Sequence, residues 1–247
     1  FGINIVSGWA PGEYSQMGLW PGDEYFAQRY DYSTEYVTIM QELWANGTVT
    51  MDGEFFQMDD CHMKPIPSNK IEIVCAGQSE RGMAFCAEFG DYQFILGTGV
   101  NTPTAYAPGN VQLLAAAEKT GRDIGSYVLF MVITGDTDEE AMAKWKLYND
   151  GVDTKALAWM ADQADSDATA DASGTAKTIS LPEGAINFNM GTLVGSYVSV
   201  ARMLDEAGSV PGTKGIMLTF DDFIDGLKIF GEKVQPLMKT RSVTVAG

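Results

Sequence analysis

The chain opens directly on an apolar strand. Ile3, Ile5 and Val6 form a short apolar run, which ends at the turn-forming pair Ser7-Gly8. A strand that is apolar on both faces belongs in the middle of a parallel sheet and needs a neighbouring strand on each side. We therefore expect the chain to be the C-terminal part of a larger α/β protein, cut at a strand whose other edge is left unpaired.

Four more apolar segments predict strands, and helical patterns separate them. These strands are expected at residues 71–75, 92–96, 127–133 and 215–220. The helices are expected at residues 26–44, 80–86, 111–119, 136–148 and 154–163, after residue 196 and from residue 223. Buried strands that alternate with helices predict a parallel sheet.

Five such strands fit the last five β/α units of a closed (β/α)8 TIM barrel, although a doubly wound sheet has the same order of elements. The dinucleotide-binding fingerprint of the second fold is missing, because Gly97-Thr98-Gly99 is followed by Thr102 where a third Gly is required. We therefore predict one α/β barrel domain over residues 1–247, with the first three β/α units absent. Within it, a polar stretch predicts a mobile insertion loop at residues 165–184.

Charge and residue usage exclude several partners and chemistries. The 33 acidic and 16 basic residues give a net charge of −17, which repels nucleic-acid phosphates and anionic lipids. No apolar stretch approaches the ~18 residues of a membrane helix, so neither nucleic acid nor a membrane is an expected partner. Cys61, Cys75 and Cys86 show no CxxC spacing and favour a reducing, cytoplasmic compartment. The single histidine, His62, leaves little material for imidazole chemistry.

Three positions are candidates for small-molecule chemistry. Gly77-Gln78-Ser79 joins a strand to a helix, where backbone amides suit a phosphate, although Ser79 as a plain helix N-cap is the more frequent explanation. Asn4 is polar within an apolar strand, where its side chain needs a hydrogen-bond partner. That partner is either an amide of a flavin or substrate, or a side chain of a neighbouring strand. Trp9 follows the same strand and would form either a pocket wall or ordinary packing.

Two acidic motifs have simpler explanations. Residues 49–51 and 54–58 flank Asp52-Gly53 and predict a hairpin. The contiguous run Asp59-Asp60-Cys61-His62 after it does not converge on one ion, so we expect a surface turn and no metal site. Asp221-Asp222 follows the last strand, where a helix cap is favoured over an acid/base pair.

Longer runs of the sequence resemble one family over essentially the whole chain. These runs are 1–9, 13–18, 20–26, 29–32, 75–79, 99–105, 190–197 and 218–223. They are similar to the pyrimidine monooxygenases of the Rut uracil-degradation pathway, a group within the luciferase-like FMN-dependent monooxygenases. The resemblance weakens only between residues 165 and 184 and at the C-terminal tail.

The resemblance implies a luciferase-like barrel and a set of cofactor contacts. It carries FMN contacts onto five residues that are all present here: Asn4, Glu13, Arg29, Tyr30 and Ser79. Ser79 and the helix amides fit the phosphate, with Arg29 and Tyr30 as supporting donors. Asn4 is assigned to the reactive edge of the flavin. Trp9, a few residues beyond it, is assigned to stacking on the substrate ring.

The implied reaction opens the uracil ring to ureidoacrylate or its peracid with reduced FMN and dioxygen. The reduced flavin would come from a separate NADH:flavin reductase, and a homo-oligomer is left open. Because the first three units would carry further contacts, the chain by itself is expected to be inactive. The alternatives are a luciferase-like monooxygenase for another small molecule, such as a sulfonate or amine, and a truncated flavin-binding protein without catalysis.

Overall fold

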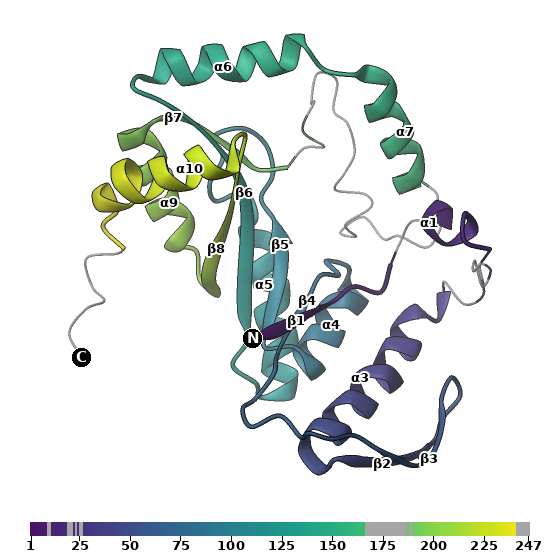
Figure 1. Cartoon of the computed structure of the whole chain (residues 1–247). Coiled ribbons are helices and arrows are strands. Elements are labelled where there is room, and N and C mark those ends of the chain that lie inside the picture. The colour runs from purple at the N-terminus through teal and green to yellow at the C-terminus, as the bar shows by residue number, and fades with distance from the viewer. Residues whose placement is uncertain are drawn as a thin grey trace.

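A computed structural model of the chain describes residues 1–8, 11–18, 22, 24, 27–165, 187 and 190–240. Its main feature is a six-stranded sheet in which every pairing is parallel (Figure 1). The strands are β1 (Gly2–Ile5), β4 (Glu72–Cys75), β5 (Tyr92–Leu96), β6 (Gly125–Gly135), β7 (Thr192–Ser196) and β8 (Thr213–Phe220). The parallel α/β class predicted from the alternating pattern is therefore confirmed.

Strand β6 lies at the centre of the sheet and is long enough to pair with three other strands. Its residues 125–129 pair with β5, and residues 131–135 pair with β7, which follows β5 along the same edge. Residues 126–132 pair with β8 on the other edge. Val128, Phe130 and Val132 alternate along it and are at most 2% exposed. The 11-residue strand thus carries much of the core.

Strand β7 was missed in the sequence, where a helix was expected to begin after Gly195-Ser196. The helix does begin there, but Thr192–Ser196 forms a strand before it. The apolar part of that strand is only Leu193 and Val194, which is too short for a periodic pattern. Its pairing with the C-terminal half of β6 makes it a strand.

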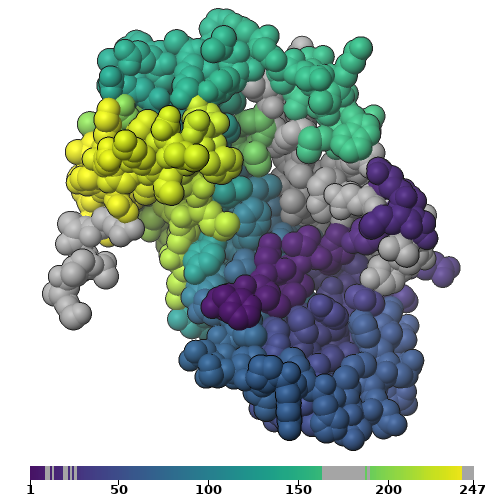
Figure 2. Space-filling model, viewed as in Figure 1, coloured from purple at the N-terminus to yellow at the C-terminus, as the bar shows by residue number. Residues whose placement is uncertain are grey.

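The first strand lies at the edge of the sheet and not in its middle. β4 is its one partner among the described residues. Ile3 and Ile5 are only half-buried, and Phe1 is 96% exposed, so the expectation of a strand buried on both faces is wrong. Among the described residues, the other edge of β1 is unpaired as expected, and Figure 2 shows the purple N-terminal segment running along the surface.

The sheet of the described residues is open. β1 and β8 lie at its two ends and are not paired with each other. A closed TIM barrel is therefore not confirmed. The predicted insertion loop at 165–184 falls outside the described residues, except for Asp165 at the end of α7 (Thr154–Asp165). Across the described ranges, no helix is both long enough and apolar enough to span a bilayer.

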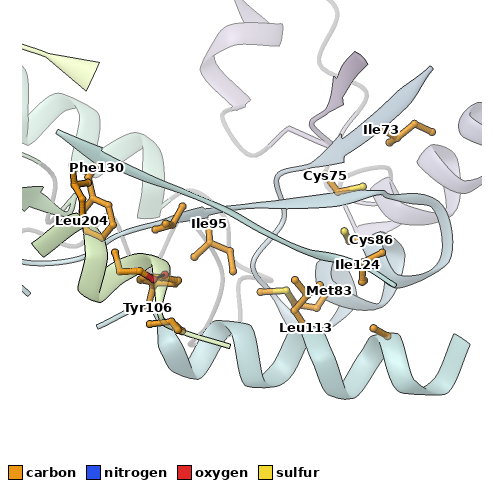
Figure 3. Packing of buried hydrophobic residues seen from close by; sticks show 14 of the residues in the cluster. Ile73, Cys75, Met83, Cys86, Ile95, Tyr106, Leu113, Ile124, Phe130 and Leu204 are labelled. Atoms are coloured by element: carbon orange, nitrogen blue, oxygen red, sulfur yellow. Dashed lines mark hydrogen bonds between the residues drawn. The ribbon is translucent and has the colours of Figure 1, made fainter. Parts of the chain in front are cut away.

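One face of the sheet is covered by helices. These are α4 (Glu80–Phe89), α5 (Ala107–Thr120) and α9 (Tyr197–Gly208). Figure 3 shows their inward side chains Met83, Leu113 and Leu204 against Ile95 and Phe130 of the strands. On the opposite face, the rings of Tyr92 and Tyr127 are half-buried and stack with centroids 4.2 Å apart. Helix α6 (Asp138–Asp150) covers another part of that face, where Ala141 packs with the buried Ile133 and Val194.

The remaining elements lie around this sheet. They are α1 (Pro11–Ser15), α3 (Arg29–Asn46), α10 (Phe223–Ile229), the π-helix η1 (Phe230–Val234) and the 3₁₀-helix η2 (Gln235–Leu237). Helix α3 ends at Gly47, close to the expected end at residue 44, and Gly47 adopts the left-handed conformation (φ 73°) of a C-terminal cap.

The predicted hairpin is present but its second strand is longer than expected. β2 (Thr48–Asp52) pairs with β3 (Gln57–His62) in antiparallel fashion. The run Asp59–His62 therefore lies in a strand, and the expectation of a surface turn is wrong. Asp60 takes a positive φ of 46° where the register shifts opposite Thr50, which is the geometry of a β-bulge.

Candidate functional site

The turn after β4 leads directly into α4 and presents the start of that helix. Ser79 is extended (φ −65°, ψ 162°), and its Oγ accepts a hydrogen bond from the backbone N–H of Gly82 at 3.1 Å. The N-cap expected from the sequence is thus confirmed. The first turn of a helix carries partial positive charge and outward amides, so the same end of α4 suits an anion.

Tyr30 joins the first turn of α3 to this helix end. Its side chain is buried, and its ring packs against Phe85 of α4 with centroids 5.8 Å apart. A Cβ on Gly77 would lie 2.1 Å from the Tyr30 hydroxyl, and one on Gly82 would lie 2.7 Å from it. Only glycine leaves room for this phenol, so two of the predicted residues, Tyr30 and Ser79, do lie around one helix start.

Two arginines flank the Tyr30 ring. The Cζ of Arg29 lies 5.5 Å from the ring centroid, and the Cζ of Arg81 lies 5.8 Å from it. Arg81 also forms an ion pair with Asp31 and donates to the carbonyl of Ala27 at 3.4 Å. A cation in the first turn of a helix is opposed by the helix dipole, so two guanidinium groups here favour an anion between them.

Arg81 was not singled out in the sequence. The one signal was its place two residues after Ser79, in the first turn, where acidic residues are usual. Its significance comes from Tyr30, which is distant in the sequence and close in the fold.

A second helix start after a strand, that of α9, is already filled by a carboxylate. Asp138 accepts from the backbone N–H of Ser196 at 2.6 Å and from the Ser199 hydroxyl at 3.1 Å. The Ser196 N–H is the main cause that holds the pKa of Asp138 below its usual value. An external anion would have to displace this carboxylate, so α4 is the better anion site of the two.

Asn4 lies on β1 opposite Val74 of β4 and its side chain is exposed. Ile3 and Ile5 pack toward the helices, so strand alternation directs Asn4 to the other, open face of the sheet. The N–H of Ala76 donates to the carbonyl of Ile5 at 3.3 Å, which brings the end of β1 beside the residue before Gly77. The strand of Asn4 and the α4 turn therefore meet at the C-terminal edge of the sheet.

Two predicted site residues cannot be placed. Glu13 lies in α1, and its side chain is outside the described part of the chain. Trp9 is also outside the described residues. Their assignments remain predictions.

Asp221 and Asp222, which follow β8, make different contacts. Asp222 caps α10 by accepting from the N–H groups of Ile224 and Asp225, so the predicted cap is confirmed. Asp221 pairs with Lys144 and accepts from the Tyr148 hydroxyl at 2.6 Å. Burial would raise the pKa of Asp221, but these two partners outweigh it and lower that pKa. Burial and Asp221 together raise the pKa of Tyr148 to about 12.

Within the described part of the chain, the run Asp59–His62 does not form a metal-binding cluster. His62 Nε2 lies 3.0 Å from Asp60 Oδ1, and both side chains are exposed. No group of three His, Cys, Asp or Glu side chains suited to a metal ion occurs in the ranges that the structure describes.

Comparison with known proteins identifies the family. The family model described as luciferase-like monooxygenase matches residues 1–207. Pyrimidine monooxygenase RutA of Bradyrhizobium sp. (strain BTAi1) is 66% identical over 242 residues, which are 98% of this chain and 67% of the relative. Pyrimidine monooxygenase RutA of Klebsiella pneumoniae subsp. pneumoniae is 55% identical, again over 98% of this chain and 67% of the relative.

A solved structure shares the fold. Riboflavin lyase (RcaE), determined with modified FMN and riboflavin, matches with a TM-score of 0.81 at 19% identity, over 100% of this chain and 65% of that one. The chain thus spans about two thirds of the length of the proteins it matches. The resemblance seen in the sequence is confirmed, and the chain belongs to the luciferase-like monooxygenase family.

Proposed function

We propose that the protein that carries this chain uses reduced FMN and dioxygen to open the pyrimidine ring of uracil, giving ureidoacrylate or its peracid. The observation that carries the proposal is the start of α4, where Ser79, Tyr30 and two guanidinium groups come together. The relatives named pyrimidine monooxygenase support the choice of substrate.

The residues around α4 suit the phosphate of FMN. A phosphate ester is a dianion that accepts several hydrogen bonds, and the α4 amides with the Ser79 hydroxyl would supply neutral donors. Arg29 and Arg81 would supply charge, and Arg81 would exchange part of its contact with Asp31 for the phosphate. Gly77 and Gly82 have no side chain, which leaves room for the Tyr30 hydroxyl beside the turn.

Bound FMN would supply the oxygen chemistry, and the chain would supply position. Asn4, on the open face at the C-terminal edge of the sheet, would present its amide to the reactive edge of the flavin. Trp9 would stack on the planar substrate, and Glu13 would contact the cofactor. The single histidine, His62, lies on the exposed hairpin, which agrees with a reaction that needs no imidazole base.

We also propose the setting of the reaction. Reduced FMN would come from a separate NADH:flavin reductase, and the enzyme would act in pyrimidine and nitrogen catabolism in the cytoplasm. Cys61, Cys75 and Cys86 are all free thiols, which supports a reducing compartment. A homo-oligomer is compatible with the fold.

The test is a reaction of the purified protein that carries this chain with FMN, NADH, a flavin reductase, oxygen and uracil. Mass spectrometry is expected to show loss of uracil and formation of ureidoacrylate or its peracid. If uracil stays intact while an alkanesulfonate or amine is consumed, the pyrimidine assignment fails and the family assignment stands. FMN binding with no substrate consumed would favour a non-catalytic flavin-binding protein.

A further inference from the structure

Gln93 is an amide in the apolar core between the sheet and its helices. It lies on β5, and its side chain is 0% exposed. The next residue on that face of the strand is Ile95, which is also buried. Burying an amide costs free energy unless hydrogen bonds replace those to water. A glutamine at this position therefore needs a reason beyond packing.

The donor end of Gln93 holds the turn that leads into α4. Its Nε2 donates to the carbonyl oxygen of Gly77 at 3.0 Å and to that of Phe94 at 3.0 Å. A second hydrogen bond connects the turn and β5, because Oε1 of the buried Gln78 accepts from the N–H of Leu96 on β5 at 3.2 Å. Two glutamines thus fasten the turn to β5.

The acceptor end of Gln93 is left unmatched. Its Oε1 is buried and has no hydrogen-bond partner within the described part of the structure. An unmatched buried acceptor is unfavourable, so the benefit of this side chain lies with its donor. The hydrogen bond from Gln93 Nε2 to the Gly77 carbonyl is therefore the interaction that explains a glutamine at this position.

Anchoring that carbonyl sets the direction of a backbone N–H. In a trans peptide the C=O of Gly77 and the N–H of Gln78 point in opposite directions. With the carbonyl directed to β5, the N–H of Gln78 is directed away from it. The Tyr30 hydroxyl fills the space beside Gly77 and restricts the turn from the other side.

We propose that Gln93 is a positioning residue for the cofactor-phosphate turn, Gly77–Ser79. It fixes the peptide plane between Gly77 and Gln78, so that the turn is already arranged when the phosphate binds. It touches neither cofactor nor substrate. The proposal rests on the FMN site proposed above and adds a residue buried behind it.

The experiment compares two flavins that differ only in the phosphate. FMN and riboflavin are titrated into the protein that carries this chain, with Gln93 intact and with Gln93→Leu, and flavin fluorescence gives each Kd. Gln93→Leu is expected to raise the Kd of FMN about tenfold and to change that of riboflavin less than about twofold. A general loss of stability would weaken both flavins alike.

Ser126→Ala is the matched control. Ser126 pairs with Gln93 in the sheet register, is equally buried, and has an unmatched Oγ, but it lies on β6 away from the turn. It is expected to leave both Kd values unchanged. If Gln93→Leu does not fold, Gln93→Asn serves, because its shorter side chain falls short of Gly77 while the amide is kept.

Equal loss for the two flavins, or no loss for FMN, would overturn the role of Gln93. Ser79→Ala with Arg29→Ala separates this from failure of the site itself. If that double variant does not change the ratio of the FMN and riboflavin Kd values, the proposed phosphate site is wrong and Gln93 loses its role with it. If the double variant changes the ratio and both Gln93 variants do not, only the inference about Gln93 fails.

Discussion

The hydroxyl of Tyr30 occupies the space that a side chain on Gly77 would need, since an added Cβ would lie 2.1 Å from that oxygen. Tyr30 belongs to the first turn of α3, and Gly77 precedes the first turn of α4. One phenol ring therefore sets how closely the two helix starts approach. The arginines on either side of the site, Arg29 and Arg81, both lie against that ring.

Gly77→Ala is expected to disturb this contact. The added methyl group must displace the phenol, and overpacking of this kind costs about 1–3 kcal/mol of unfolding free energy. FMN binding should weaken at the same time, because Tyr30 and both arginines would shift. Chemical denaturation and FMN titration measure the two effects. Gly231→Ala is the control, because a Cβ there meets nothing within 4 Å; equal results for the two variants would contradict the steric argument.

Ser79→Ala combined with Arg29→Ala should weaken FMN binding tenfold or more. Hydrogen bonds to charged groups contribute about 1.5–3 kcal/mol each, and the two changes remove a hydroxyl and a guanidinium from the proposed phosphate site. FMN titration measures the loss. Asp59→Ala and His62→Ala, on the exposed hairpin strand β3, should leave the Kd unchanged. A large loss from His62→Ala would instead assign that hairpin to the site.

The fold was predictable where the pattern is local. Alternating strands and helices, the glycine that ends α3 and the Asp222 cap all depend on residues that are close in the sequence. Strand β7 has only two apolar residues, Leu193 and Val194, and depends on pairing with β6. The half-exposed state of β1 depends on its place at the edge of the described sheet, which its apolar residues do not reveal.

The candidate site shows the same division between local and distant information. Ser79 was found because a turn before a helix has a recognisable pattern, and Arg29 and Tyr30 were found through the family resemblance. Arg81 and Gln93 were missed. Their proposed roles depend on Tyr30 and on the Gly77 carbonyl, which the fold brings to them from other elements.

Glu35 should make the stability of the hairpin depend on pH. Its carboxylate accepts from three backbone N–H groups in the hairpin loop: Glu54 at 2.7 Å, Phe55 at 2.9 Å and Phe56 at 3.0 Å. Desolvation acts to raise the pKa of Glu35, but these three donors outweigh it and hold the pKa below the usual value. The ionised form is therefore the one that the folded state favours.

The lowered pKa of Glu35 determines how its contribution to stability changes with pH. A group with a lower pKa in the folded state stabilises the protein above its unfolded pKa, and this contribution is lost as the pH falls through the folded pKa. Thermal unfolding of the native chain and of Glu35→Gln is the measurement. The native chain should be the more stable at neutral pH, and the difference should shrink on acidification. A difference that does not vary with pH would show that the carboxylate charge is unimportant.

Trp9 is the residue assigned to the substrate, and its variant separates substrate from cofactor. Trp9→Ala should lower kcat/KM for uracil about tenfold, because an aromatic pair contributes ~0.5–1.5 kcal/mol beyond the area it buries. The Kd of FMN should change much less, since the proposed phosphate site is formed by Ser79 and the two arginines. Trp159→Ala, which removes an exposed ring on α7, is the matched control for loss of a tryptophan. If the Kd of FMN rises as much as kcat/KM falls, Trp9 contacts the flavin and the substrate assignment is wrong.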